Sequence, residues 1–402
     1  MEIYLDNAAT TRVYPEAAAL MMKVMQEDYG NPSSLHMKGV EAERYLRYAR
    51  ETFANILKVD GRELIFTSGG SESNNMALMG AAAANCRMGR HIISTRIEHP
   101  SVYNPLTYLE GQGYEITYLP VDNYGIVKPE ALRKALRPDT IMLSVMCVNN
   151  EIGTIEPIED IVSIVRETNP DTLIHVDAIQ GFAKMKLYPK RLGIDMMSIS
   201  GHKFHGPKGT GLLWVREGAK LHPLILGGGQ QKGRRSGTEN VPGYAGMAKA
   251  AELEFTDFDA RLDRLYELRK YFIERVLTIE GTSLNGGSDR GSLRLTEESR
   301  QGACAAPHVV SISFEGVRAE VLLHALEEKK IYVSSGSACS SNHPQLSGTL
   351  KAIGVRKDLL DSTLRFSFSY DTDKEQLDMC TDALQELLPV LRLVSPGGRR
   401  RR

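Results

Sequence analysis

Polar side chains that can do chemistry follow several of the short apolar runs in this sequence. They are a lysine amine, a carboxylate, an imidazole, a pair of amides and a Gly/Ser turn, at Lys203, Asp177, His99, Asn149-Asn150 and Ser68-Gly69-Gly70-Ser71. Ligands of open α/β sheets bind at the carboxyl ends of parallel strands, so we expect these groups on one rim of a sheet. A lysine for a Schiff base, an aspartate for a pyridinium nitrogen and a helix N-terminus for a phosphate are what pyridoxal phosphate requires. The residues alone therefore predict a pyridoxal phosphate site, with His99 available to stack on the ring.

Each of these residues also has a simpler interpretation. Ser71 and Asp177 are good helix caps, Gln180 suits a solvated turn, and His99 suits a loop with its hydrogen bonds satisfied. Only their joint placement on one predicted rim favours the cofactor site.

Cys339 lies in the segment Val-Ser-Ser-Gly-Ser-Ala-Cys-Ser-Ser, whose small polar residues cannot form a core. We expect this loop to be exposed and poorly ordered from about Ser340 to Gly348. Cys147 and Cys380 lie in apolar patterns typical of structural thiols, and Cys86 and Cys304 remain ambiguous. Cys339-x3-His343 offers only two ligands, so no metal site is predicted.

Strands and helices alternate over roughly the first 255 residues. Strands are expected at 63–67, 91–95, 114–121, 140–148, 172–176 and 195–200, and helices at 73–84 and 157–169. This alternation predicts an α/β fold with a mostly parallel central sheet and helices on both faces. The run 209–217 follows the preceding strand without a helix, which predicts an antiparallel or edge strand.

The pattern changes after about residue 255. A long amphipathic helix at 259–279 suits a connector, and the polar, Gly-rich segment 281–306 predicts a surface loop. Strand and helix patterns then alternate from 309 to 394, which predicts a smaller α+β unit. The last residues, SPGGRRRR, are expected to be a disordered tail.

Composition excludes several classes of protein. The 402 residues include 49 Lys+Arg and 50 Asp+Glu, so we expect no direct binding of nucleic acid or membrane surface through net charge. No apolar run reaches the length of a membrane span, and the first residues have no signal-peptide pattern. Five cysteines argue against a disulfide framework and favour a cytoplasmic location.

The sequence resembles the cysteine desulfurases of the class V aminotransferase family, of the nitrogen-fixation and iron–sulfur-cluster type. The matching segments, in order, are YLDNAATT, GNPSSLH, FTSGGSESNN, EHPSV, VNNEIG, HVDAIQ, SGHKFHGPKG, RRSGTEN, SSGSACSS and LRFSF. The resemblance spans nearly the whole chain. It implies a fold-type-I pyridoxal phosphate enzyme with a large domain at 13–260 and a small domain formed by 1–12 and 261–402.

The resemblance also implies roles for individual residues. Lys203 would be the Schiff-base lysine, and Cys339 the nucleophile. The cofactor would be held at its ring by Asp177, Gln180, His99 and Asn150, and at its phosphate by Gly70, Ser71, Ser200 and His202. Thr238 would reach the phosphate of the partner subunit in a homodimer, and Asn150 and Arg365 would bind the substrate carboxylate.

The implied reaction removes sulfur from L-cysteine, giving L-alanine and a persulfide on Cys339. The sulfur would pass to an acceptor protein, for iron–sulfur cluster assembly or tRNA thiolation. The chain departs from the family pattern at His205, where an aromatic residue is usual, and in the length of the 281–306 segment.

Two other interpretations stay open at this point. A selenocysteine lyase, or another class V pyridoxal phosphate enzyme, would share most of these residues. A non-catalytic sulfur-relay or scaffold protein would need Cys339 but would not need Lys203, Asp177 and His99.

Overall fold

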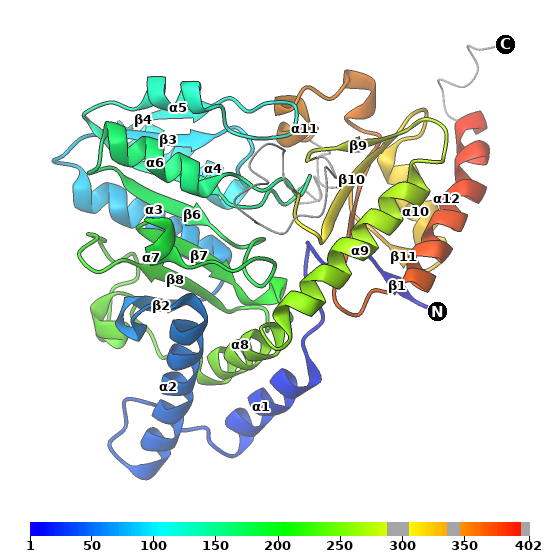
Figure 1. The fold of residues 1–402 in the computed structure, drawn as a ribbon. Coiled ribbons are helices and arrows are strands. Elements are labelled where there is room, and N and C mark those ends of the chain that lie inside the picture. Colours follow the sequence, from blue (N-terminus) through cyan, green and yellow to red (C-terminus); the bar gives the residue numbers. More distant parts are fainter. Residues whose placement is uncertain (288–304, 336–345, 395–402) are drawn as a thin grey trace.

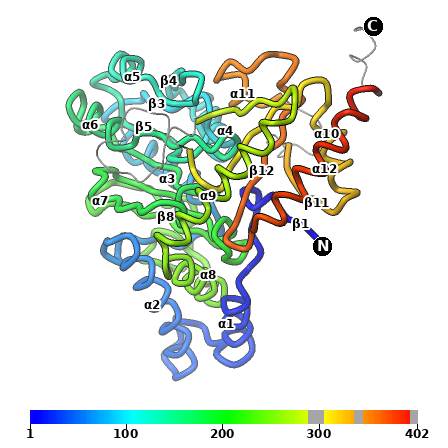
Figure 2. The backbone as a smooth tube through the Cα atoms, turned by 45° about the vertical axis from the view of Figure 1, so that its right-hand side comes forward, coloured from blue at the N-terminus to red at the C-terminus, as the bar shows by residue number. Residues whose placement is uncertain are grey.

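The structure is a computed structural model of the chain, and it describes residues 1–287, 305–335 and 346–394. Figures 1 and 2 show a large α/β part and a smaller part joined by the long helix α9. Along the part of the chain that the structure describes, no helix is both long and apolar enough to cross a membrane.

The large part is built on a sheet of seven described strands in the order β2-β8-β7-β6-β5-β3-β4 (Figure 1). The strands are β2 (Leu64–Thr67), β3 (His91–Thr95), β4 (Glu115–Leu119), β5 (Thr140–Met146), β6 (Leu173–Asp177), β7 (Met196–Ser200) and β8 (Gly211–Val215). β8 pairs antiparallel with β2 and β7, and the other neighbouring strands are parallel. The predicted mostly parallel sheet is therefore confirmed. β8 is antiparallel as expected, but it is not an edge strand because β2 pairs along its other side.

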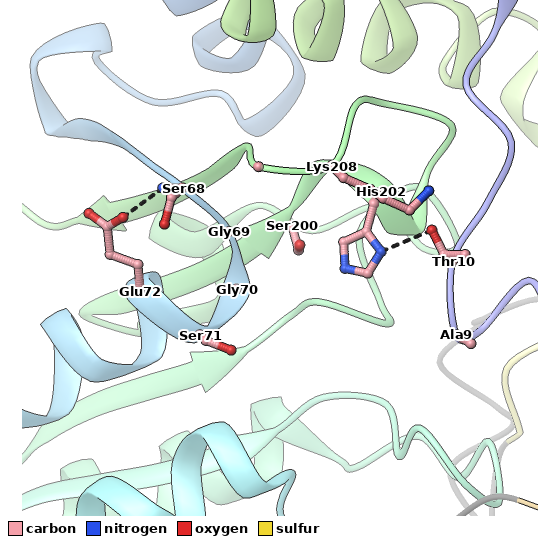
Figure 3. Close-up of a pocket in the computed structure, with 11 residues that line it drawn as sticks. Ala9, Thr10, Ser68, Gly69, Gly70, Ser71, Glu72, Ser200, His202 and Lys208 are labelled. Atoms are coloured by element: carbon pink, nitrogen blue, oxygen red, sulfur yellow. Dashed lines mark hydrogen bonds between the residues drawn. The ribbon is translucent and has the colours of Figure 1, made fainter. Parts of the chain in front are cut away.

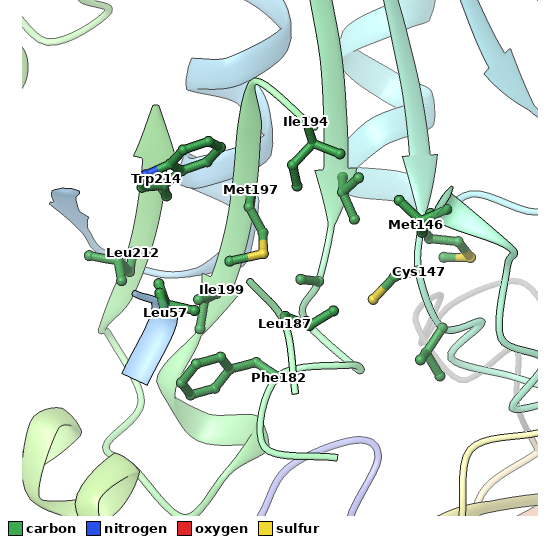
Figure 4. Close-up of a cluster of buried hydrophobic side chains, with 14 of the residues drawn as sticks. Leu57, Met146, Cys147, Phe182, Leu187, Ile194, Met197, Ile199, Leu212 and Trp214 are labelled. Atoms are coloured by element: carbon green, nitrogen blue, oxygen red, sulfur yellow. The ribbon is translucent and has the colours of Figure 1, made fainter. Parts of the chain in front are cut away.

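Successive strand residues point to opposite faces of the sheet, and both faces are buried. Ile65 and Leu213 belong to an apolar cluster that α3 and α4 cover. Their neighbours Phe66 and Leu212 belong to a second cluster, which includes residues of α2, α6 and α8. Figure 4 shows part of this second cluster around β7 and β8. The strands are thus apolar on both sides, and polar groups are left for the strand ends.

Helices of the large part follow the periodicity of their sequences. They are α1 (Pro15–Gln26), α2 (Met37–Leu57), α3 (Gly70–Asn85), α4 (Pro100–Gly111), α5 (Pro129–Ala135), α6 (Ile158–Thr168), α7 (Pro189–Leu192) and α8 (Val241–Glu254). In α6, Ile158, Ile161, Val162 and Val165 are buried on one face, as the predicted amphipathic pattern requires. Short 3₁₀ turns lie at η1 (Gly61–Glu63), η2 (Gly201–Lys203), η3 (Gln230–Gly233) and η4 (Lys357–Leu359).

The smaller part has its own apolar cluster, which joins residues from the two ends of the chain. Its elements are β1 (Ile3–Tyr4), α9 (Phe258–Val276), β9 (Thr282–Asn285), β10 (Val309–Phe314), α10 (Ala319–Glu328), β11 (Ile331–Tyr332), α11 (Gly348–Ala352), β12 (Thr363–Ser367) and α12 (Lys374–Val394). β1 pairs with β11, so the N-terminus lies beside the small part (Figure 1). Ile3 and Leu5 pack in the same cluster as residues from Leu265 onward. The division at 12/13 and 260/261 stays a prediction.

The prediction of a surface loop at 281–306 is wrong for its first residues. β9 pairs antiparallel with β10 along the edge opposite β12. Asn285 is buried there and donates to Ser313 Oγ at 2.9 Å. The polar sequence forms a strand because the backbone of β10 requires hydrogen-bond partners along that edge. Residues 288–304 lie outside the described residues.

Candidate active site

The polar groups singled out in the sequence do meet at one rim of the large sheet. β2, β3, β5, β6 and β7 run in the same direction, so their carboxyl ends share an edge. The Ser68-Gly69-Gly70-Ser71 turn, His99, Asn149-Asn150, Asp177 and η2 follow these strands in turn. The fold thus places an amine, a carboxylate, an imidazole and an anion-binding turn together.

The turn after β2 forms one wall of a cavity of about 450 Å³, a size within the range of roughly 300–1,000 Å³ for small-molecule sites (Figure 3). Gly69 has φ 154° and ψ −177°, a region that only glycine adopts without strain. A Cβ on Gly70 would lie 2.3 Å from Ile179 Cδ1 and 3.3 Å from Ser200 Cβ. Both glycines are therefore required for the backbone N–H groups of α3 to line the cavity.

Two side chains at and just after the end of β7 also line the cavity, and Ser200 lies beside Gly70. Ser200 Oγ is buried and has no hydrogen-bond partner among the described residues. His202 Nδ1 lies 3.2 Å from Thr10 Oγ1 (Figure 3), and burial together with Lys203 and Lys208 lowers the pKa of its imidazole to about 4. An unpartnered hydroxyl, a helix N-terminus and a nearby imidazole fit a phosphate group.

Lys203 ends η2 and reaches back to the N-terminal segment. Its Nζ donates to the backbone carbonyls of Ala8 and Ala9 at 2.7 and 2.8 Å. The backbone of the same segment binds the lysine loop, because Thr11 N donates to His202 O at 2.9 Å. The amine is thereby held beside the cavity by the segment that follows β1.

Asp177 is buried at the end of β6, and burial raises the pKa of its carboxyl. Its Oδ1 accepts from Ile179 N at 2.9 Å, and its Oδ2 accepts from Asn74 Nδ2 at 2.8 Å. These two donors and the nearby Lys203 favour the ionised form and oppose the effect of burial. An ionised aspartate here suits a pyridinium nitrogen.

His99 caps the N-terminus of α4. Its Nδ1 accepts from Ser101 N at 3.1 Å and lies 2.8 Å from Ser101 Oγ. Burial is the main cause of the lowered pKa of this imidazole, which favours the neutral ring. Because Nδ1 accepts a backbone N–H, the proton of the neutral ring lies on Nε2.

Gln180 also points toward the N-terminal segment. Its Nε2 donates to Ala8 O at 2.9 Å, and its Oε1 lies 3.1 Å from His308 Nε2. Burial is the largest cause of the strongly lowered pKa of His308. The amide of Gln180 is thus held in one orientation by the neutral His308 and by the Ala8 carbonyl, which also accepts from Lys203.

Arg365 in β12 brings the small part to the same site. Its Nη1 donates to Asn150 O at 2.8 Å, and its Nη2 pairs with Asp6 Oδ1 at 2.9 Å. Its Nε is buried and lacks a partner within the described chain. The structure therefore brings the two predicted carboxylate-binding residues together, through the backbone of Asn150.

Cys339 lies outside the described residues, as do Cys304 and His343, so the predicted disorder of its loop stays a prediction as far as residue 345. It is wrong at the end of the segment, where Ser347 is buried and Gly348 begins α11. The chain on either side of the cysteine segment is described. Ser334 exchanges two backbone hydrogen bonds with Arg365, at 3.1 and 2.6 Å. Ser347 Oγ donates to Glu151 Oε2 at 2.5 Å, and Thr349 Oγ1 donates to Glu151 Oε1 at 3.2 Å. Both flanks of the cysteine segment are thus attached next to Arg365 and Asn150.

The other cysteines differ in environment. Cys147 and Cys380 are buried, and burial raises the pKa of both thiols, as expected for structural cysteines. Cys86 is exposed. Within the described residues, no group of three or more His, Cys, Asp or Glu side chains could hold a metal ion.

Thr238 is exposed and does not line the cavity of its own chain. Its neighbour Arg235 donates to both carboxylate oxygens of Glu72, at 2.8 and 3.2 Å. Glu72 Oε2 also accepts from Ser68 N at 2.8 Å at the start of the phosphate turn (Figure 3). The segment of Thr238 is therefore fixed to the cavity rim, while Thr238 itself does not line the described cavity.

Sequence reasoning missed several residues of this site. Asn74, Ser101 and His308 contact the expected residues, but they do not stand at the strand ends themselves. Asn74 lies four residues after Gly70, one helical turn into α3, and that spacing is the signal that would have found it.

Comparisons with known proteins agree with this arrangement. A family model described as Aminotransferase class-V matches residues 3–380. A protein from Dictyoglomus turgidum named cysteine desulfurase IscS is 44% identical over 396 residues, which cover 98% of this chain and 96% of that protein. A solved structure described as a NIFS-like protein has a TM-score of 0.89 and 36% identity, covering 97% of this chain and 100% of that chain. A structure described as SspA in complex with cysteine has a TM-score of 0.77 and 32% identity, covering 92% and 99%.

Proposed function

This chain belongs to the aminotransferase class-V family and is a cysteine desulfurase, and we propose that it acts through Lys203, His99 and Cys339 on pyridoxal phosphate bound at the strand ends. The observation that carries the proposal is the convergence of Lys203, Asp177 and the Gly69-Gly70 turn on one rim. A sulfur-relay protein would have no use for this convergence.

The residues present fit the cofactor. Gly70, Ser71, Ser200 and His202 would hold its phosphate, and Asp177 its ring nitrogen. Gln180 would donate to its phenolic oxygen, and His99 would stack on its ring with Asn150 nearby. When bound, pyridoxal phosphate supplies an electron sink for the negative charge that develops at the substrate α-carbon.

The protein groups move the protons. Lys203 Nζ takes the α-proton of cysteine, and Asp177 keeps its carboxylate beside the ring nitrogen. His99 carries its proton on Nε2, where it serves proton transfer. The Nε of Arg365, which has no partner within the described chain, suits the substrate carboxylate beside Asn150.

Cys339 then attacks as a thiolate, because the neutral thiol is a poor nucleophile. A bond forms between its Sγ and the substrate sulfur, and the substrate carbon–sulfur bond breaks. The electron pair of that bond stays with the carbon skeleton, which takes up protons and leaves as alanine. The persulfide on Cys339 keeps the sulfur.

We further propose that the persulfide sulfur passes to an acceptor protein, for iron–sulfur cluster assembly or tRNA thiolation. The sparse cysteines support a reducing, cytoplasmic location. A homodimer would complete each site with Thr238 of the partner subunit.

Replacing the lysine tests the cofactor assignment. Lys203→Ala should lose the visible absorbance of a lysine-bound cofactor and at least 10³-fold of alanine formation from cysteine, because no other group occupies its position. Lys134→Ala, on the exposed face of α5, is the control and should keep both. Unchanged absorbance in Lys203→Ala would place the covalent bond on another amine and overturn the assignment.

A further inference from the structure

Asn74 contacts Asp177 and the serine beside His99, two side chains of the proposed site that are both assigned to the cofactor ring. It lies one helical turn into α3 and is fully buried. Its Nδ2 donates to Asp177 Oδ2 at 2.8 Å and to Ser101 Oγ at 2.9 Å. A single amide group thus contacts the carboxylate of β6 and the hydroxyl beside His99.

The orientation of this amide is fixed by the charge of its neighbour. With the amide reversed, Asn74 Oδ1 would face the carboxylate oxygen of Asp177, two acceptors with no proton between them. In the observed orientation Oδ1 is buried and has no partner in the described part of the chain. The side chain therefore leaves one acceptor unsatisfied in order to make two donor contacts, which is unusual for a purely structural asparagine.

The contact with Ser101 extends to the imidazole. Because Ser101 Oγ accepts from Asn74, its own hydrogen is free to point at His99 Nδ1, 2.8 Å away. The backbone N–H of Ser101 donates to the same nitrogen at 3.1 Å. Both contacts require a lone pair on Nδ1 and thereby keep the proton on Nε2.

We propose that Asn74 is a positioning residue that couples Asp177 to His99, holding the carboxylate for the cofactor ring nitrogen and the imidazole in its Nε2–H form. The inference rests on the proposed function, since it assigns a shared support to two residues of that site. Asn74 itself touches neither substrate nor cofactor in this account.

Three variants of the holoenzyme separate positioning from packing. Asn74→Leu keeps the size and removes both donor contacts. Ser101→Ala removes the hydroxyl contact to the His99 ring, keeps the backbone contact and leaves Asn74 on Asp177. Asn85→Leu, at the other end of α3, removes a buried asparagine whose side chain donates to the carbonyls of Ala81 and Lys220, and it is the control for lost stability.

Two readouts report on the two partners. The pH midpoint of the cofactor absorbance reports on the charge held at the ring nitrogen. Exchange of the Cα hydrogen of alanine for deuterium, followed by NMR, reports on proton removal without any sulfur chemistry.

Asn74→Leu should shift the absorbance midpoint by at least half a pH unit and slow the exchange at least tenfold. Ser101→Ala should slow the exchange at least threefold and leave the midpoint unchanged. Asn85→Leu should lower the melting temperature alone.

If Asn74→Leu fails to fold or to bind the cofactor, Asn74→Asp is measured in its place. It has the same shape but sets a second carboxyl group against Asp177, so it should shift the same midpoint further and also slow the exchange. The inference is overturned if the Asn74 variant that binds the cofactor keeps its exchange rate within twofold of wild type and its absorbance midpoint within 0.2 pH units of wild type. Asn85→Leu should stay within the same limits. Absence of both signals in the wild-type protein would instead contradict the proposed function.

Discussion

Buried ionisable side chains near the strand ends hold unusual protonation states. His175 lies in β6 between Ser144 Oγ and Ser198 Oγ, at 2.9 Å from each, and burial lowers the pKa of its imidazole to about 3. Burial raises the pKa of the Glu98 carboxyl to about 8. Thr95 Oγ1 and Met146 N donate to Glu98 Oε1, while its Oε2 has no partner among the described residues. Both side chains are therefore neutral near pH 7.

The raised pKa of Glu98 predicts a pH-dependent stability. Unfolding returns the carboxyl to an ordinary pKa near 4.5, so between about pH 4.5 and 8 the folded chain binds one more proton than the unfolded chain. The free energy of unfolding should then fall by up to roughly 1.4 kcal/mol per pH unit as the pH rises through this window. Glu98→Gln should lose this dependence. Urea unfolding of the cofactor-free proteins at pH 5, 6, 7 and 8 measures the difference, with Glu130→Gln on α5 as an exposed control. Parallel curves for Glu98→Gln and wild type would contradict the prediction.

At this scale, the sequence was enough to identify the groups that follow strand ends directly, such as Lys203, Asp177 and His99. It was not enough for residues whose role depends on side-chain packing between elements. Asn74 and Ser101 belong to different helices, and their contact depends on how α3 and α4 pack against each other. No local pattern encodes that distance.

Among the elements, the short helix α11 attaches one flank of the segment that carries Cys339. Ser347 caps it by accepting from Leu350 N at 3.0 Å and also donates to the half-buried Glu151. The flank of the segment that carries Cys339 is thus attached to the strand end that carries Asn150.

Ser347→Ala should lower the free energy of unfolding by about 1–3 kcal/mol, because it removes a helix cap and one donor to a buried carboxylate. In the double variant Ser347→Ala/Glu151→Gln, the loss of unfolding free energy should differ from the sum of the two single losses by about 1 kcal/mol. Urea unfolding measures both quantities. Ser163→Ala removes an exposed serine–glutamate hydrogen bond on α6 and should change stability by less than about 0.5 kcal/mol. Strict additivity for Ser347 and Glu151 would show that their contact contributes nothing.

Sequence patterns predicted most strands of the large sheet to within two residues, because the buried parallel strands are short, nearly continuous apolar runs. They failed at β9, whose polar residues form a strand only because β10 presents an unpaired edge. They predicted β8 as an antiparallel or edge strand, but they did not show that β2 pairs along its other side.

In the whole molecule, the two ends of the chain meet in one apolar cluster, and the segment after β1 reaches from there to Lys203. We propose that Thr238 of the partner subunit completes the site. Thr238 is exposed, and Leu226 nearby in sequence is 78% exposed. Residues of this segment are therefore available to a neighbouring molecule.

Mixed dimers test whether Thr238 acts across an interface. A heterodimer of Lys203→Ala and Thr238→Ala protomers has one intact site if Thr238 serves the partner subunit, and it should keep about half of the wild-type turnover. If Thr238 serves its own chain, each site carries one defect, and turnover should not exceed half that of the Thr238→Ala homodimer. The measurement is alanine formation by purified heterodimers at limiting cofactor. A monomer in sedimentation at assay concentration would also contradict the prediction.

The central claim is that Cys339 takes sulfur from cysteine and that its loss spares the cofactor site. The most direct measurement compares wild type and Cys339→Ala for cofactor absorbance, melting temperature and alanine formed from cysteine under reductant. We expect that Cys339→Ala binds the cofactor, melts within about 2 °C of wild type and loses at least 10³-fold of alanine formation, because no other thiol replaces the nucleophile. Near-normal alanine formation by Cys339→Ala, with or without lost stability, would contradict the desulfurase mechanism and favour an elimination or a selenocysteine-specific enzyme.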